Sequence, residues 1–310
     1  MEKRPRLNPL LVLAFGILAV STASILVRYA QEEAPSLVIA AWRLSLAAII
    51  LAPLALTRDR TVLRALQRNE IALALLAGLF LALHFATWIS SLEFTTVASS
   101  AVLVTTTPLW VALVSPIFLK EPITRPVMVG MILALIGGIT IGLSDTCIWQ
   151  SGALVCPDLG EMVRGRAFMG DLLALAGAMF AAAYVIIGRK LRVNITLLSY
   201  IFLVYGAAAI LLVILMLFTG GSAFGYPPIT YLWFLLLALI PQLLGHSSFN
   251  WALKYVSAAY VSITLLGEPI GATILAYFLL DEAPTTVKVF GAILILAGIF
   301  IASRVEVKQS

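Results

Sequence analysis

The chain has 310 residues, of which 62% are hydrophobic and only 11% are charged, and its formal net charge is +5. Soluble domains are about 45–50% apolar, so a soluble enzyme of this length could not cover so much apolar surface. The composition therefore excludes a soluble globular protein and indicates a chain that lies in a lipid bilayer.

Ten apolar runs of about twenty residues follow one another along the chain, which is the length a helix needs to cross a bilayer core of roughly 30 Å. The first run continues to Arg28. It is longer than the apolar core of a signal peptide, so we interpret it as a helix and not as a cleaved leader. The predicted spans are 9–30, 35–56, 70–91, 96–119, 125–143, 169–188, 197–219, 230–252, 257–280 and 284–303.

The basic residues gather on one side of this arrangement. With a cytoplasmic N-terminus, the outer side carries only Arg28, Arg164, Arg166 and Lys288, and Arg43 lies inside a span. This positive-inside pattern predicts that both termini are cytoplasmic in a multi-pass protein of the bacterial inner membrane. It also explains the net charge without a nucleic-acid partner. The inner side carries Lys3, Arg4, Arg6, Arg58, Arg60, Arg64, Arg68, Lys120, Arg125, Arg189, Lys190, Arg192, Lys254, Arg304 and Lys308.

A constant shift of 161 positions aligns the two halves of the chain. Apolar matches mean little in so hydrophobic a sequence, whereas matched Gly, Pro, Arg and Glu at one register indicate a duplication. The matched pairs include Gly16 with Gly177, Arg28 with Arg189, Pro108 with Pro269, Glu121 with Glu282, Gly130 with Gly291 and Gly137 with Gly298.

We therefore expect a first five-helix repeat over residues 1–145, an extracytoplasmic loop over 146–168 and a second repeat over 169–310. Because five is odd, the second repeat starts on the opposite side of the membrane. The predicted fold is an all-α polytopic membrane protein with ten transmembrane helices in two inverted repeats. Such repeats let one central site open to either side in turn, although a duplication can also merely build a stable bundle.

Residues of both halves carry a family pattern. Pro108 precedes Lys120-Glu121-Pro122, and Gly267-Glu268-Pro269 precedes Asp281-Glu282. This pattern resembles the paired EamA-type modules of the drug/metabolite transporter superfamily along almost the whole chain. The resemblance implies ten helices, cytoplasmic termini and export of amino acids or other metabolites, with YddG-type aromatic amino-acid exporters as the nearest subfamily. The opening Phe15-Gly16 departs from the usual aromatic-glycine start.

Polar groups inside the predicted spans are candidates for a transport pathway, because they are costly in a bilayer. Several recur at helical spacing and are expected to line one central cavity. With aromatic side chains that could stack on a substrate, the candidate substrate-binding residues are Trp42, Arg43, His84, Trp88, Trp110, Tyr184, Tyr205, Gln242, His246, Asn250, Tyr260, Thr264 and Glu268.

Two charges have no counterpart in the partner repeat. Glu268 corresponds to Thr107, and Arg43 corresponds to Val204. We hypothesise that Arg43 or a polar group of span 230–252 binds a substrate carboxylate, and that Glu268 binds an amine or carries a proton. The alternative is that Glu268 bonds to neighbouring helices beside Pro269, and that Arg43 snorkels towards the membrane surface or braces a loop.

The other chemistry-bearing residues suggest fewer roles. His84 and His246 could relay protons or bond helices together, but two histidines do not indicate a metal cluster. Cys147 and Cys156 could form a disulfide in the outer loop or remain free thiols. No zinc-protease, phosphate-loop or paired-carboxylate motif indicates an enzyme, and no filter indicates a channel.

The sequence thus predicts a secondary transporter without cofactor or metal, in monomeric or loosely dimeric form. It would export small amphipathic metabolites, above all aromatic or other apolar amino acids, by alternating access around a midplane cavity. Export of nucleotide sugars or cationic drugs is the alternative within the superfamily. A membrane-embedded enzyme or a channel is the alternative outside it.

Overall fold

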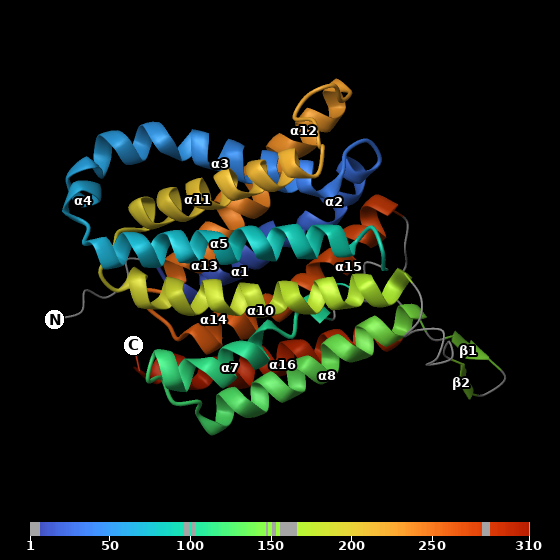
Figure 1. The fold of residues 1–310 in the computed structure, drawn as a ribbon. Coiled ribbons are helices and arrows are strands. Elements are labelled where there is room, and N and C mark those ends of the chain that lie inside the picture. Colours follow the sequence, from blue (N-terminus) through green and yellow to red (C-terminus); the bar gives the residue numbers. More distant parts are fainter. Residues whose placement is uncertain are drawn as a thin grey trace.

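The computed structural model describes residues 7–95, 100, 103–146, 148–150, 153–155, 166–280 and 286–309. Nearly all of these residues are helical, and the long helices lie side by side in an elongated bundle (Figure 1). One antiparallel hairpin, β1 (Ile148–Gln150) and β2 (Ala153–Val155), projects from the end of the bundle opposite to the start of the first helix (Figure 1).

The helices of the first half keep close to the predicted spans. They are α1 (Pro9–Val20), α2 (Ala23–Gln31), α3 (Ser36–Arg58), α4 (Arg60–Ala65), α5 (Arg68–Ser91), α7 (Thr107–Phe118) and α8 (Arg125–Thr146). The first span is broken between α1 and α2. There the Ser21 hydroxyl donates to the Ile17 carbonyl at 2.7 Å, and the Thr22 hydroxyl donates to the Ala19 carbonyl at 2.8 Å. Such side-chain bonds compete with the helix ladder and bend helices.

The second half begins with two regular helices and continues with two irregular ones. Its elements are α10 (Arg166–Arg192), α11 (Leu197–Phe218), α12 (Pro228–Leu237), η1 (Ala238–His246), α13 (Ser247–Ala252), α14 (Ala258–Thr264), η2 (Leu265–Gly267), α15 (Glu268–Leu280) and α16 (Thr286–Gln309). The stretch η1 is a π-helix that contains Pro241, and η2 is a single 3₁₀ turn just before Glu268. Proline removes a backbone donor, so the wider π-helix is a natural local response.

Six helical segments of the described chain are long and apolar enough to cross a membrane. They are Pro9–Gln31, Ser36–Arg58, Arg68–Ser91, Phe168–Arg192, Leu197–Phe218 and Pro228–Ala252. Three shorter apolar helices, Thr107–Phe118, Arg125–Gly137 and Val289–Ala302, lie within other predicted spans. The number of complete spans is therefore at least six by this measure, and the predicted total of ten remains an expectation. Helix α4 and the hairpin were not predicted.

The outer surface of the bundle is apolar, and its interior combines large apolar and aromatic side chains with small and polar ones. Ile117 is 75% exposed, Phe278 is 72% exposed and Phe218 is 85% exposed. A soluble monomer rarely exposes such large apolar patches, so the solvent around these helices is lipid. Small residues inside the bundle let the helix backbones approach closely.

The packing repeats itself under the shift that aligns the two halves. A Cβ atom on Gly16 of α1 would touch Ser248 and Phe249, and one on Gly177 of α10 would touch their counterparts Thr87 and Trp88. Helix α1 starts at the end of the bundle where α10 finishes, so the two repeats run in opposite directions (Figure 1).

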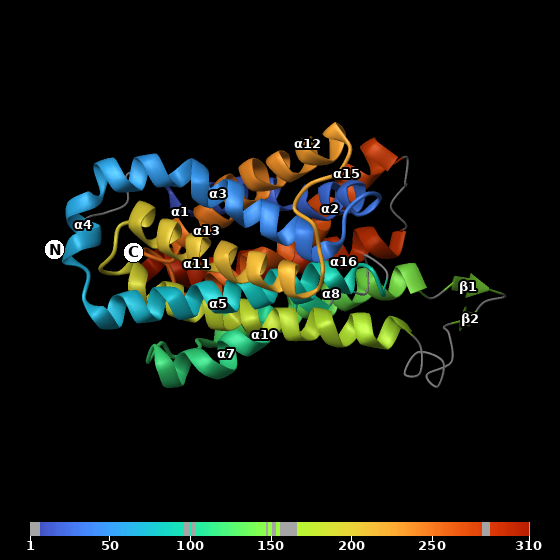
Figure 2. The same cartoon turned by 45° about the horizontal axis from the view of Figure 1, so that its top comes forward.

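A second contact between the two repeats follows the same symmetry. Helices α8 and α16 lie side by side in both views (Figures 1 and 2). A Cβ on Gly130 would lie 2.4 Å from the Gly298 carbonyl oxygen, and one on Gly137 would lie 2.5 Å from the Gly291 oxygen. These two contacts are counterparts of each other, because the shift that relates Gly130 to Gly291 also relates Gly137 to Gly298.

Candidate functional site

A cavity of about 70 Å³ lies between the two repeats. Its volume exceeds what a single water molecule requires, so it can hold several waters or part of a small solute. Helices α3, α5, α7, α10 and α15 contribute to its wall, together with η1 and α13. Seven of the predicted site residues line it, namely Arg43, His84, Trp88, Tyr184, His246, Asn250 and Glu268.

The cavity lies on the axis that relates the repeats. Much of its lining comes in pairs related by the shift of 161 positions, so each repeat contributes the same wall positions. One such pair, Phe85 and His246, meets directly with ring centroids 5.3 Å apart. The other pairs are Val20 with Ala181, Ala23 with Tyr184, Trp88 with Phe249, Val104 with Leu265 and Thr107 with Glu268.

Arg43 is the most unusual residue of this cavity. Its side chain is completely buried on α3, where its Nε donates to Oε1 of Gln242 at 2.9 Å. The centre of its guanidinium group lies 4.1 Å from the centroid of the Phe85 ring, a cation–π distance. Its Nη1 is buried and has no partner among the described residues. A buried cationic donor without a partner is costly, so this atom is a ready binding point for an anion.

Glu268 brings the opposite charge to the same cavity. It starts α15 directly after the 3₁₀ turn η2, and its backbone carbonyl accepts a hydrogen bond from Ser21 at 3.2 Å. Its charge acts on that of Arg43, but the two side chains do not form an ion pair with each other. Glu268 also lines a smaller cavity beside Pro269 and Ser24. The cavity therefore holds a basic and an acidic side chain that are not paired with each other.

The aromatic wall is built around His84 on α5. Its Nδ1 lies 2.9 Å from the Gly177 carbonyl oxygen of α10. A carbonyl can only accept, so Nδ1 carries the proton, and in the neutral ring Nε2 remains an acceptor. The imidazole stacks on Trp88 with a ring-centroid distance of 6.1 Å and an interplanar angle of 2°. This wall offers flat apolar faces to a substrate.

A network of buried hydroxyls and amides borders the cavity. The Asn250 amide donates to the hydroxyl groups of Tyr184 and Tyr205, the latter at 3.2 Å. Tyr205 also lies 3.3 Å from the Ser247 hydroxyl oxygen. The Oδ1 atom of Asn250 is buried without a partner among the described residues, so it can accept a further hydrogen bond.

The remaining predicted residues lie away from the cavity lining, and their roles remain predictions. Tyr205 and Gln242 stand directly behind it, bonded to Asn250 and Arg43. Trp42 belongs to an aromatic cluster with Phe224, Tyr231 and Phe234, and its indole donates to the Ala223 carbonyl at 2.9 Å.

The other three of these residues lie on helices that border the cavity. The Trp110 indole donates to the Thr106 hydroxyl at 3.3 Å. Tyr260 is buried on α14, and the Thr264 hydroxyl donates to the Val261 carbonyl at 2.7 Å. None of the three is among the residues that line the cavity.

Sequence reasoning missed two aromatic residues of the lining. Phe85 carries the contact with Arg43, and Phe249 is the repeat counterpart of Trp88. Both could have been found by extending the comparison of the two halves from polar residues to aromatic ones, because each is the counterpart of a predicted site residue.

The sequence predicted no metal site and suggested a disulfide, and neither expectation is tested by the described part of the chain. Within it, no three His, Cys, Asp or Glu side chains are grouped closely enough to hold a metal ion. Cys147 and Cys156 lie outside the described residues, so the predicted disulfide remains a prediction.

Comparison with known proteins places this architecture among transporters. The family model of the EamA-like transporter family matches residues 7–143 and again residues 168–304. The uncharacterized transporter YyaM of Bacillus subtilis is 25% identical over 271 residues, which cover 86% of this chain and 84% of the relative. An uncharacterized transporter of Clostridium kluyveri is 27% identical over 256 residues, with 81% and 78% covered.

One solved crystal structure superposes on the chain with a TM-score of 0.73 at 18% sequence identity. The superposition covers 97% of this chain and 98% of that one. At this identity the likeness supports the fold alone. It shows that the overall arrangement of the helices in both halves is one that another folded protein adopts.

Proposed function

The chain belongs to the EamA-like transporter family, and we propose that it is a secondary exporter of small amphipathic metabolites, above all of aromatic or other apolar amino acids. The observation that carries this proposal is the buried Nη1 of Arg43, which has no partner among the described residues and belongs to a cavity that Glu268 also lines. An α-amino acid carries the complementary carboxylate and ammonium groups.

The arrangement of the wall favours an aromatic or apolar side chain on that amino acid. The carboxylate would accept hydrogen bonds from Arg43, and the ammonium group would face Glu268. The side chain would then lie against His84, Trp88 and Phe85, whose ring faces suit stacking and cation–π contacts. This specificity agrees with the YddG-type resemblance noted in the sequence.

Transport would proceed by alternating access. A site on the symmetry axis of two inverted repeats can open to either side when the repeats exchange conformations. We further propose that the chain spans the bacterial inner membrane ten times with both termini in the cytoplasm. Helix α4, which carries Arg60 and Arg64, lies at the end of the bundle where α1 starts, which fits the cytoplasmic side (Figure 1).

Export of a cationic drug is the second candidate, because Glu268 and the aromatic wall alone could hold an organic cation. Export of a nucleotide sugar is less well supported. A diphosphate favours several bases, and Arg43 is the only Lys or Arg side chain in the described lining.

Counterflow in proteoliposomes tests the proposal. Vesicles loaded with unlabelled amino acid are expected to accumulate the same labelled amino acid, most strongly for aromatic and large apolar members of a panel. Repeating the assay with and without a pH gradient tests coupling to protons. If the vesicles accumulate no amino acid but do accumulate an organic cation, the drug-exporter alternative holds.

A further inference from the structure

A second, more polar pocket of about 290 Å³ lies at the end of the bundle where α1 starts. It is enclosed by the segment after α7, by Arg189 of α10 and by the turn between α13 and α14. It shares no lining residue with the central cavity, so it is a separate site. The residues that matter are Ser115, Lys120, Glu121, Thr124, Arg189 and Lys254.

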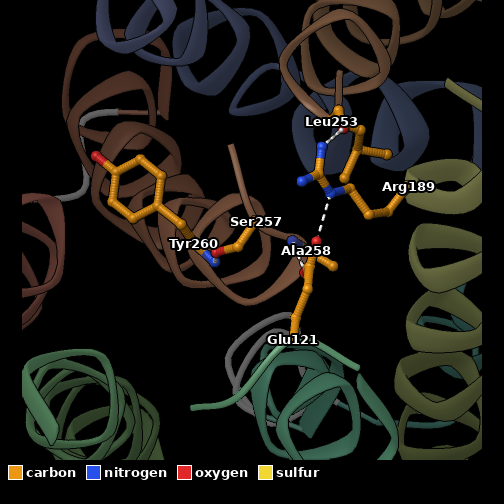
Figure 3. Close-up of polar contacts among 6 residues, drawn as sticks. All are labelled: Glu121, Arg189, Leu253, Ser257, Ala258 and Tyr260. Carbon is orange, nitrogen blue, oxygen red and sulfur yellow. Dashed lines mark hydrogen bonds and ion pairs between the residues drawn. The ribbon is translucent and has the colours of Figure 1, made fainter. Parts of the chain in front are cut away.

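The carboxylate of the acidic residue of this pocket already has partners. Glu121 accepts from Nε of Arg189 at 2.6 Å and from the backbone N–H of Ala258 at 3.3 Å. Arg189 also donates to the Leu253 carbonyl at 2.8 Å, so the pair joins three segments of the chain (Figure 3). Both charges are thereby satisfied, and neither demands a further partner.

The two lysines leave the pocket positive. Lys120 and Lys254 are exposed, and neither has an ion-pair partner within the described part of the chain. The lining carries three bases, Lys120, Arg189 and Lys254, against the single acid Glu121, so two positive charges remain. An anion fits this pocket, whereas a cation would be repelled.

Hydroxyl groups complete the donor set. Ser115 is fully buried, and its Oγ has no hydrogen-bond partner among the described residues. The Oγ1 atom of Thr124 is also buried and has no hydrogen-bond partner among the described residues. Leaving such a group unsatisfied is costly, so the two hydroxyls favour an acceptor within the pocket.

We propose that this pocket binds a phosphate group, held by Lys120 and Lys254 and by the hydroxyls of Ser115 and Thr124. A phosphate offers several acceptor oxygens and up to two negative charges, which match two ammonium groups and two hydroxyl donors. The phosphate belongs either to the headgroup of an anionic lipid or to a soluble ion. The site does not depend on the transported substrate, so it stands independently of the proposed function.

The backbone of Lys120 provides a way to test this without damaging the fold. Lys120 has a φ of 57°, in the left-handed region that glycine adopts without steric cost. Lys120→Gly therefore removes the ammonium group while relieving the backbone, and a second change, Lys254→Gln, removes the other charge. Arg58→Gln with Arg60→Gln is the matched control, because it removes two exposed charges at the same end of the bundle but outside the pocket.

The experiment measures thermal unfolding of the purified full-length protein under two titrations. In detergent, inorganic phosphate replaces chloride at constant ionic strength. In lipid nanodiscs, phosphatidylglycerol replaces a zwitterionic lipid. At least one titration is expected to raise the unfolding temperature of the wild type and of the control. A response to phosphatidylglycerol alone identifies a lipid headgroup, and a response to phosphate identifies a soluble ion.

The variants decide whether the response comes from this pocket. K120G/K254Q is expected to weaken the apparent affinity at least about tenfold, since a hydrogen bond to a charged group contributes about 1.5–3 kcal/mol. S115A/T124V keeps every charge and is expected to weaken it about threefold or more, and it decides the matter if K120G/K254Q fails to fold. The proposal is overturned if neither titration stabilises the wild type, if the apparent affinity is unchanged in folded K120G/K254Q or in S115A/T124V, or if it falls equally in the control.

Discussion

The crossing of α8 with α16 and the central cavity obey the same pseudo-symmetry, yet they use it differently. At the crossing, Gly130 meets Gly298 as Gly137 meets Gly291, so both repeats contribute the same residue type at matched places. In the cavity, Thr107 matches Glu268 and Ala23 matches Tyr184. Under the proposed function, equal residues would let the scaffold adopt either half's conformation, whereas unequal residues would give the ligand one orientation.

The largest expected effect comes from the cavity, through Arg43→Gln. This change removes the charge that would hold the substrate carboxylate, and truncating a buried charged partner costs about 2–5 kcal/mol. We expect counterflow of amino acids to fall about a hundredfold or more. Val204, the counterpart of Arg43 in the other repeat, supplies the control: Val204→Ala should change transport little, provided that both proteins remain monodisperse.

The next effect comes from the crossing, through Gly130→Ala. The new Cβ would lie 2.4 Å from the Gly298 carbonyl oxygen, so the helices must separate. We expect a loss of about 2 kcal/mol in unfolding free energy, since overpacking costs about 1–3 kcal/mol. Gly137→Ala should cost a similar amount.

Gly206→Ala is the control for the crossing. A Cβ at Gly206 meets nothing within 4 Å, and alanine is the better helix former. Thermal unfolding of the three variants checks the expectation. Equal unfolding temperatures for G130A and G206A would show that the crossing does not stabilise the fold.

A smaller effect is expected from Glu268→Gln, which keeps the shape of the side chain and removes its charge. Loss of one charge-assisted contact with a substrate ammonium group should weaken transport about tenfold. Thr107→Val changes the matched position of the first repeat and should weaken transport less than about threefold. If the two variants were equally active, the asymmetry of this pair would have no role in binding.

The smallest effect is expected from Tyr184→Phe. It removes a hydroxyl that accepts from Asn250, while Tyr205 keeps its own bond to the same amide. The expected cost is about 1 kcal/mol, which corresponds to a few-fold loss of affinity. Titration of substrate binding to the purified protein measures this loss of affinity. An unchanged affinity would show that the tyrosine network does not contribute to substrate binding.

The fold was predictable because its signals are local or repeated. Apolar runs in the sequence mark the helices, and the fixed shift between the halves relates the contact of Gly16 with Ser248 to that of Gly177 with Thr87. The hairpin and α4 were not predicted because they are short: each strand has three residues and α4 has six, too few for a periodic pattern to be recognised.

The site was only partly predictable, because two spans leave regular α geometry. Regular spacing placed Tyr260 and Thr264 on one face with Glu268, but the 3₁₀ turn at Leu265–Gly267 changes the phase, and only Glu268 reaches the cavity. The π-helix at Ala238–His246 is wound more loosely than an α-helix and shifts the side-chain directions the other way. Gln242 consequently lies behind Arg43 and not in the lining. A sequence pattern that assumes 3.6 residues per turn misses both shifts.

The account rests on the pairing of Arg43 with a substrate carboxylate, and competition between tryptophan and tryptophan amide tests it most directly. The amide keeps the ring and the amine but lacks the negative charge. We predict that the wild type and Arg58→Gln, which removes an exposed base outside the cavity lining, prefer tryptophan, and that Arg43→Gln does not distinguish the two ligands. An undiminished preference for tryptophan in Arg43→Gln would contradict the account.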